Sequence, residues 1–302
     1  MNRKNRFDHL SMGTREQIAG YLFVAPLMIG LVVLTLIPVV FSLLLSFTNW
    51  NFVAGFDAIK FAGFDNFVKL FNDSAFVQSL KNNLIFIFTV PVTMILALVF
   101  AILIDKYVYI KDTFKVIYFL PYISSIVAVA MVWQVLFHPS LGPVNQTLAA
   151  LGVDNPPKWL ADIDFALPSL MMIQVWIMLG YNIIIYIAGL QSIPKDLYEA
   201  ADIDGANVWV KFRNITVPCI SPTTFFLLVT GIIGSFKIFD LIQVLTKGGP
   251  ANSTTVIVYE LYDTAFVELK TGYASSMALI LFLICLIITA AQWIAQKKWV
   301  NY

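Results

Sequence analysis

Charged residues are scarce in this chain of 302 residues. They make up 12% of it, about half of the roughly 25% that soluble domains carry. The hydrophobic fraction is 59% and the mean hydropathy is +0.82. The apolar residues come in long blocks, which is typical of a protein that spans a membrane several times. The net charge of +1 gives no indication of nucleic-acid binding.

Cysteine and histidine are also rare, which disfavours several kinds of chemistry. Cys219 and Cys285 both lie in apolar blocks, where buried packing thiols are expected rather than a disulfide or a metal site. His9 and His138 have no neighbours that would complete a metal or catalytic set. The sequence has no GxxxxGK[ST] phosphate-binding motif. We therefore expect no catalytic site, no metal site and no bound cofactor in this chain.

Six apolar segments reach the roughly 20 residues that a helix needs to cross the hydrocarbon core. They cover residues 20–46, 80–104, 114–137, 166–188, 219–243 and 273–295. The first follows a basic N-terminus, but it is much longer than the apolar core of about 7–15 residues in a signal peptide. The sequence thus predicts an all-α, polytopic membrane protein whose first span is retained.

Lysine and arginine predict the orientation of the spans, because they concentrate on the cytoplasmic side. With Arg3, Lys4, Arg6 and Arg15 inside, the inner segments carry about twice as many basic residues as the outer loops. We therefore expect a cytoplasmic segment 1–19, a membrane domain 20–295 and a cytoplasmic tail 296–302. In the outer loops, residues 141–152 and 254–269 are expected to form short helices along the membrane surface.

Residues 190–218 form a polar segment between the fourth and fifth apolar blocks. Ser192 is a candidate helix cap, and Pro194 suits the first turn of a helix. Glu199 suits the positive end of that helix, and Gly205 suits its end. We expect a short helix, a glycine corner and a second short helix.

The second of these helices is expected over residues 206–215. Val208, Phe212 and Ile215 would then make one apolar face. An amphipathic unit of this kind can lie in the groove of a partner or pack beneath its own bundle. The residues alone leave both possibilities open.

The stretch EAADIDGANVWVKFRNITVP resembles the EAA motif of the permease subunits of binding-protein-dependent ABC importers. That motif has EAA, three residues, Gly, nine residues and then Ile-x-Leu-Pro. The matching positions are Glu199, Ala200, Ala201, Gly205, Ile215 and Pro218, and Val217 replaces the leucine. The stretches GLQSIPKDLYEAADIDGA and VLTKGGPANSTTVIVYELYDTAF resemble the first permease of carbohydrate importers of the maltose and glycerol-3-phosphate type. The resemblance extends over nearly the whole chain.

This resemblance implies a fold, a function and a set of partners. The fold would be the six-helix permease fold of type I ABC importers, with residues 190–218 as a cytoplasmic helix-turn-helix that couples to an ATPase. The coupling residues would be Glu199, Ala200, Ala201, Asp202, Gly205, Ile215 and Pro218. The partners would be a second permease subunit in a heterodimer, two ATPase subunits or domains that hold ATP and Mg, and an extracytoplasmic solute-binding protein. The complex would import a sugar or oligosaccharide across a bacterial plasma membrane, in contact with membrane lipid.

The fourth and fifth apolar blocks carry the expected substrate path, because polar groups in hydrocarbon usually face the interior of a bundle. Seven residues, or two helical turns, separate Gln174 from Tyr181, so the two share a face. In the maltose relative, aligned through the EAA and GGP motifs, the sugar contacts fall on these faces. The candidates are Gln174, Tyr181, Asn182, Gly231, Ser235 and Ile238. Helix packing by small and polar residues would give the same pattern.

An ion-coupled secondary transporter of a small polar solute is the alternative function. That class should show ionisable residues near the bilayer midplane and inverted repeats. The clearest intramembrane charges, Lys237 and Asp240, lie near one end of a span. They are expected to form a local ion pair, to let the lysine reach toward the membrane surface, or to act at an outer gate.

Overall fold

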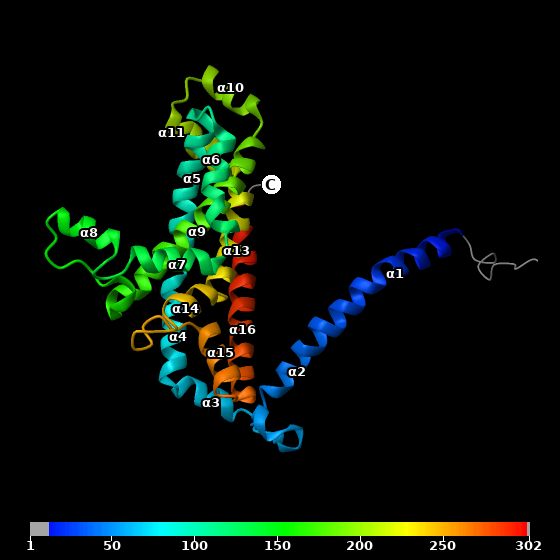
Figure 1. Ribbon diagram of the computed structural model, residues 1–302. Helices are drawn as coiled ribbons and strands as arrows, with labels where there is room; N and C mark the ends of the chain where they lie inside the picture. Colours follow the sequence, from blue (N-terminus) through cyan, green and yellow to red (C-terminus); the bar gives the residue numbers. More distant parts are fainter. Residues whose placement is uncertain (1–11, 301–302) are drawn as a thin grey trace, which may run out of the picture.

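The structure is a computed structural model, and it describes residues 12–300 (Figure 1). The predictions that involve Arg3, Lys4, Arg6, His9 and residues 301–302 lie outside the described residues. Within the described range the chain is helical, with a single isolated bridge between Thr48 and Phe61 and no strand. The predicted all-α fold is therefore confirmed.

The helices follow one another with short connections. In chain order the α-helices are α1 (Met12–Leu31), α2 (Ile37–Leu45), α3 (Asp65–Asn72), α4 (Ser74–Phe86), α5 (Thr89–Tyr107), α6 (Lys111–Ile123), α7 (Ile126–Leu136), α8 (Pro143–Ala150), α9 (Ile163–Gln191), α10 (Lys195–Ile203), α11 (Val208–Lys211), α12 (Val217–Cys219), α13 (Ser221–Phe236), α14 (Asp240–Leu245), α15 (Ile257–Tyr262) and α16 (Thr271–Gln296). Three π-helical segments continue them, at Val32–Leu36, Phe212–Thr216 and Asp263–Val267, and 3-10 turns lie at Phe52–Ala54, Phe56–Ala58 and Trp159–Ala161. The short helices predicted in the outer loops correspond to α8 and α15.

Four helical stretches in the described range are long and apolar enough to cross a membrane. They are Glu16–Leu45, Ser74–Tyr107, Ile163–Gln191 and Thr271–Gln296. Two bent pairs also qualify by length and composition: α6 with α7, bent by 94°, and Val208–Cys219 with α13, bent by 61°. The number of spans reaches six if each bent pair is one span, so the predicted six-span count stays a prediction.

The third and fifth predicted segments are not continuous helices, contrary to the sequence prediction. The helix over residues 114–137 breaks at Ser124, whose backbone is extended and whose hydroxyl donates to the carbonyl of Leu120 at 2.7 Å. Ser125 follows with a ψ of 126°, so two successive residues leave the helical conformation. In the segment 219–243, Pro222 helps to start a new helix, and α13 ends at Phe236 before a separate α14 begins. Proline lacks the N–H that a continuous helix requires.

Helix α9 runs through the middle of the body and packs against α5 and α6 (Figure 1). Its Gly180 lies so close to α6 that a Cβ atom there would lie 1.8 Å from the carbonyl oxygen of Tyr118. Glycine is therefore required for this close approach. Buried apolar side chains from α5, α9 and α13, including Ala97, Ile183 and Leu227, fill the core beside this crossing.

The first span extends away from this body (Figure 1). The span covers 30 residues, Glu16–Leu45, and is about 45 Å long, and its most apolar window of 18 residues has no buried residue. Only its C-terminal end is held: the carbonyl of Ser46 accepts hydrogen bonds from Ser276 Oγ at 2.7 Å and from Asn66 Nδ2 at 3.1 Å. The first span thus leaves a large apolar surface for lipid or for another polypeptide.

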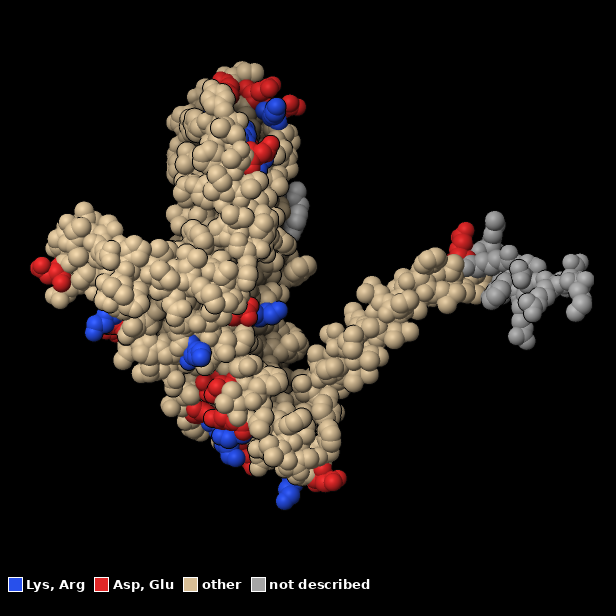
Figure 2. Space-filling model, in the orientation of Figure 1, with Lys and Arg blue, Asp and Glu red and all other residues tan. Residues whose placement is uncertain are grey.

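Charged side chains gather at the end of the body that carries α10 and toward the opposite end, with an uncharged band between them (Figure 2). This distribution fits a helical body embedded in a membrane.

Candidate functional site

The polar segment predicted at residues 190–218 forms a loop of two short helices at one end of the body (Figure 1). Helix α10 begins after Pro194, whose side chain makes no cap hydrogen bond. Ser192 is not the cap of this helix, contrary to the sequence prediction, because its hydroxyl donates to the carbonyl of Gly189 at 2.7 Å and closes α9 instead.

Gly205 forms the predicted corner, with a left-handed φ of +71°. The N–H of Ala206 donates to the carbonyl of Ala201 at 2.9 Å, and the N–H of Gly205 donates to that of Asp202 at 3.1 Å. This pair of bonds is the Schellman motif, which ends a helix and normally places glycine at this position.

The second helix begins at Val208, where the side chain of Asn207 accepts the N–H of Val210 at 2.9 Å. The single apolar face predicted for Val208, Phe212 and Ile215 is not formed. Val208 is 72% exposed, whereas Ile215 packs against the core. The reason is the π-helical segment Phe212–Thr216, because its wider turn shifts the side chains out of 3.6-residue register.

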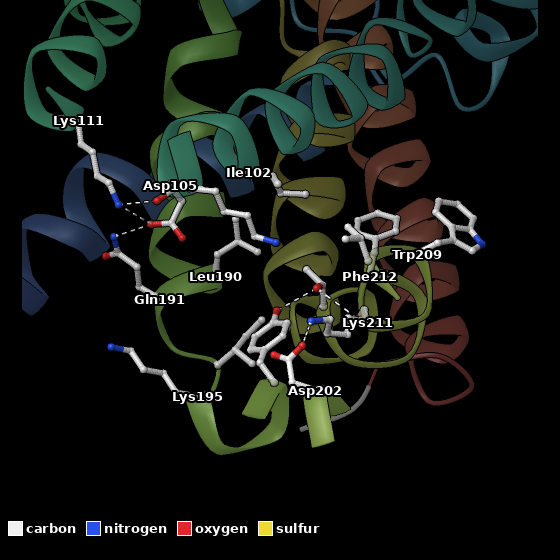
Figure 3. A pocket seen from close by; sticks show the side chains of 15 residues that line it. Ile102, Asp105, Lys111, Leu190, Gln191, Lys195, Asp202, Trp209, Lys211 and Phe212 are labelled. Carbon is white, nitrogen blue, oxygen red and sulfur yellow. Dashed lines mark hydrogen bonds and ion pairs between the residues drawn. The ribbon is translucent and has the colours of Figure 1, made fainter. Parts of the chain in front are cut away.

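Two contacts fasten the helices of the loop to each other. The hydroxyl groups of Tyr198 and Thr216 share a hydrogen bond of 2.9 Å, and Thr216 is buried. The ammonium group of Lys211 pairs with the carboxylate of Asp202 (Figure 3). Asp202 was predicted from the sequence, but Tyr198 and Thr216 were not, because residues so far apart in sequence carry no local signal of contact.

The outer surface of the loop is open to a partner. Glu199 and Ala200 are exposed and Ala201 is half-buried, and no ion pair of Glu199 occurs in the part of the chain that the structure describes. Ile203 is 87% exposed nearby. An exposed apolar side chain beside an acid without an ion pair suits a protein interface, where apolar groups give affinity and charges give orientation. Ile203 was not predicted from the sequence.

A second site is a cavity of about 190 Å³ in the middle of the body. It brings together five of the six predicted path residues: Gln174, Tyr181, Asn182, Gly231 and Ser235. Its lining also contains residues that the sequence analysis did not select: Thr89, Val90, Thr93, Tyr122, Met178, Leu227, Thr230 and Gly234. The threonines of α5 could have been found only from the contact of α5 with α9 and α13.

The chemistry of this cavity is neutral and polar. The rings of Tyr122 and Tyr181 stack with centroids 4.8 Å apart. The hydroxyl of Thr93 donates to the carbonyl of Thr89 at 2.7 Å, and Ser235 donates to Ile232 at 2.8 Å. Because these hydroxyl protons are engaged within their own helices, the oxygens remain as acceptors. The lining carries no charged side chain, so the cavity suits an uncharged solute with hydroxyl groups.

Two glycines of α13 have different roles at this cavity. A Cβ atom on Gly231 would lie 2.7 Å from Cγ1 of Val90, so this glycine serves helix packing as well as lining the cavity. A Cβ atom on Gly234 would meet nothing within 4 Å. Gly234 is therefore not needed for helix packing, and its missing side chain enlarges the cavity.

Ile238, the sixth predicted path residue, does not line the cavity. It is buried in an apolar cluster with Leu241 and Ile242, because α13 ends at Phe236 and the chain turns before Ile238. Its neighbours Lys237 and Asp240 form no ion pair within the described residues, so the local pair considered from the sequence is absent there. The described residues also contain no group of three or more His, Cys, Asp or Glu side chains that could hold a metal ion.

An all-helical membrane body with a polar cavity and a two-helix loop at one end is the architecture of a transport permease. The chain belongs to the family described as binding-protein-dependent transport system inner membrane component, whose model matches residues 78–300. It is accordingly a multi-pass membrane protein of a transport system, and its similarity to the first permease of carbohydrate importers is confirmed.

Curated relatives match the chain over nearly its full length. It is 34% identical to the lactose transport system permease protein LacF of Rhizobium radiobacter, over 93% of this chain and 95% of that protein. It is 35% identical to the sn-glycerol-3-phosphate transport system permease protein UgpA of Agrobacterium fabrum, over 95% of this chain and 97% of that protein.

A solved structure shares the fold. It is a chain of the bacterial alginate ABC transporter, crystallised in complex with a periplasmic protein bound to an alginate pentasaccharide. The TM-score is 0.84 at 25% identity, over 96% of this chain and 98% of that one.

Proposed function

We propose that this chain forms half of the translocation path of an ATP-driven importer for a sugar or oligosaccharide. The loop at residues 190–218 would couple this path to separate ATPase subunits, which bind ATP and Mg. The observation that carries the proposal is the loop itself, with its Schellman corner at Gly205 and the exposed pair Glu199 and Ala200. The contacts between the two helices of the loop make it rigid. Movement of a bound partner would therefore be transmitted through the loop to α9 and α13.

The solute would pass the cavity between α5, α9 and α13. Ligand pockets usually measure about 300–1,000 Å³, so a cavity of about 190 Å³ is small for a sugar. A second permease subunit would supply the other half of the path and would also cover part of the exposed first span. A transporter of the alternative, ion-coupled class typically has Asp, Glu, His, Lys or Arg where the solute binds, and the lining here has none of these.

The remaining partner is an extracytoplasmic solute-binding protein that docks at the end of the body opposite the loop. In the proposed orientation, both termini and the loop lie in the cytoplasm. The distribution of Lys and Arg along the sequence supports this orientation.

The test is the capture of partners from the native membrane, followed by mass spectrometry. The tagged chain is expected to retain an ATPase and a second permease in mild detergent. Glu199→Lys should abolish retention of the ATPase, because it reverses the charge in the middle of the proposed interface. The matched control, Asp154→Lys, makes the same change at an exposed acid of the loop after α8. An ATPase retained equally by both variants would contradict the coupling role.

A further inference from the structure

A large cavity lies directly beneath the coupling loop, and the proposed function does not use it (Figure 3). Its volume is about 910 Å³, near the upper end of the range of about 300–1,000 Å³ for small-molecule sites. Its walls come from the end of α5, the start of α6, the end of α9 and both helices of the loop. A ligand here would touch the spans and the loop at the same time.

The cavity carries a net positive charge. Its lining has four lysines and two aspartates: Lys106, Lys111, Lys195, Lys211, Asp105 and Asp202. Each aspartate is already engaged, since Lys111 lies 3.6 Å from Asp105 and Lys211 pairs with Asp202. Within the described residues, Lys106 and Lys195 form no ion pair. Two ammonium groups therefore remain available to an anion.

Basic and aromatic side chains lie on different sides of the cavity, apart from Lys211, which pairs with Asp202. Figure 3 shows Lys111 and Lys195 on one side of the cavity, and Phe212 and Trp209 on the other, beside Lys211. At its inner end the wall includes Ile102 of α5. One turn away on that helix, Val99 is 51% exposed, so an apolar surface continues from the cavity along the span. A ligand that satisfies both sides has an anionic head and an apolar tail.

The end of α5 that lines the cavity has the features of a membrane interface. The span of α5 ends at Tyr107, and the side chains of Tyr107 and Tyr109 there are 72% and 103% exposed. Exposed tyrosine and tryptophan are enriched where a span meets the interface. A soluble metabolite has no need of this depth, whereas a phospholipid is held there by its chains.

We propose that this cavity binds the headgroup of an anionic phospholipid, with Lys106 and Lys195 holding the phosphate and the acyl chains lying along α5. Basic pockets between spans on the cytoplasmic side are known to take such headgroups. The lipid would connect α5 to α10 and stabilise the position of the coupling loop. The proposal rests on the proposed function only for placing this end of the body in the cytoplasm.

The experiment uses the fluorescence of Trp209, which lines the cavity. The purified full chain is placed in phosphatidylcholine nanodiscs that contain a fixed fraction of brominated lipid, either phosphatidylglycerol or phosphatidylcholine. Bromine quenches nearby tryptophan, and Trp209→Phe identifies the signal of this residue among the 7 tryptophans. Brominated phosphatidylglycerol is expected to quench Trp209 more strongly than brominated phosphatidylcholine.

Variants assign this preference to the two lysines. Each lysine near an anionic headgroup contributes about a five-fold preference, so Lys106→Gln with Lys195→Gln should weaken phosphatidylglycerol binding roughly 25-fold. Lys106→Arg with Lys195→Arg keeps both positive charges and should keep the preference. This result would show that the loss in the glutamine variant is not a folding defect. The matched control, Lys60→Gln with Lys69→Gln, removes two exposed lysines at the opposite end and should change nothing.

Two results would overturn the proposal. One is equal quenching of Trp209 by the two brominated lipids. The other is displacement of phosphatidylglycerol by inorganic phosphate but not by chloride at the same ionic strength, which would assign the cavity to a soluble phosphate compound. Neither readout involves an ATPase or transport, so a failure here is distinguishable from a failure of the proposed function.

Discussion

The side-chain amide of Asn83 donates a hydrogen bond to the main-chain carbonyl of Ser235 at 3.0 Å. The same side chain accepts the N–H of Ile257 at 2.8 Å. Asn83 is fully buried, so one residue of α4 fixes both the end of α13, where the cavity is lined, and the start of α15. The position of Ser235 in the cavity thus depends on a helix that precedes it by 152 residues.

Asn83→Leu should destabilise the protein, because it leaves a buried carbonyl and a buried N–H without partners. Each such group costs about 1–3 kcal/mol. We expect a lower melting temperature in detergent than for the unchanged protein. Asn72→Leu is the control, since Asn72 is exposed and its side chain bonds only within α3. Equal melting temperatures of the two variants would argue against the role of Asn83.

Gly205→Ala should destabilise the loop at residues 190–218, because φ at this position is +71°. A left-handed backbone costs an alanine about 1–2 kcal/mol. No atom lies within 4 Å of the added Cβ, so the effect is one of backbone strain and not of a clash. ATP-driven uptake should fall, and Gly205→Asn should recover part of it, since asparagine tolerates this conformation. Uptake that is equally low in both variants would indicate a need for space at this site instead.

Gly180→Ala should prevent α6 and α9 from packing, because the new Cβ would lie 1.8 Å from the carbonyl oxygen of Tyr118. Backbone atoms cannot move aside as a side chain does, so the cost should reach or exceed the roughly 1–3 kcal/mol of ordinary overpacking. Gly234→Ala adds the same methyl group where nothing lies within 4 Å. Size-exclusion chromatography should show folded protein for Gly234→Ala and aggregation for Gly180→Ala. A monodisperse Gly180→Ala protein would contradict the close crossing.

Gln174→Leu should reduce uptake without reducing the amount of folded protein. Gln174 lines the cavity and its amide has no hydrogen-bond partner among the described residues, so the change removes a group that is free to bind solute. We expect a higher KM for the transported solute, measured in vesicles at saturating ATP. Ile238→Leu is the control, because Ile238 lies outside the cavity in the apolar core. An unchanged KM in Gln174→Leu would remove this residue from the path.

Stability should depend on pH through Glu260 in α15. Burial raises the pKa of Glu260 from 4.5 to about 7, and Asp73, Asp263 and Glu268 add repulsion. Between these two values the unfolded chain loses the proton while the folded chain keeps it. Ionisation therefore favours unfolding more strongly as the pH rises, and stability falls from about pH 4.5 to about pH 7.

Glu260→Gln should remove this part of the pH dependence, because glutamine stays neutral. The measurement is the melting temperature across the same pH range. Glu199→Gln, at the opposite end of the body, is expected to leave the dependence unchanged. A parallel decline in the unchanged protein and in Glu260→Gln would assign the effect to other groups.

Local patterns in the sequence were sufficient to predict the helical class, the loop and its corner. Gly205 was predictable because helices commonly end on a left-handed residue, and glycine is favoured at that single position. The cavity was partly predictable, since Gln174 and Tyr181 repeat at helical spacing. Ile238 does not share the predicted face with Gly231 and Ser235, because the helix ends at Phe236.

What the sequence could not predict depends on contacts between distant segments. Two hydrogen bonds join residues 18 and 152 positions apart: Tyr198 with Thr216, and Asn83 with Ser235. The cavity beneath the loop exists only once α5, α9 and α10 converge.

Among the described residues, the first span packs on the body through α2 and Ser46 at its C-terminal end. The free energy of covering its long apolar flank, by lipid or by another polypeptide, is consequently separate from the packing of the body. Melting curves of the isolated chain will hardly respond to substitutions between residues 20 and 40. We expect the same substitutions to change instead how this span is covered, by lipid or by a second permease subunit.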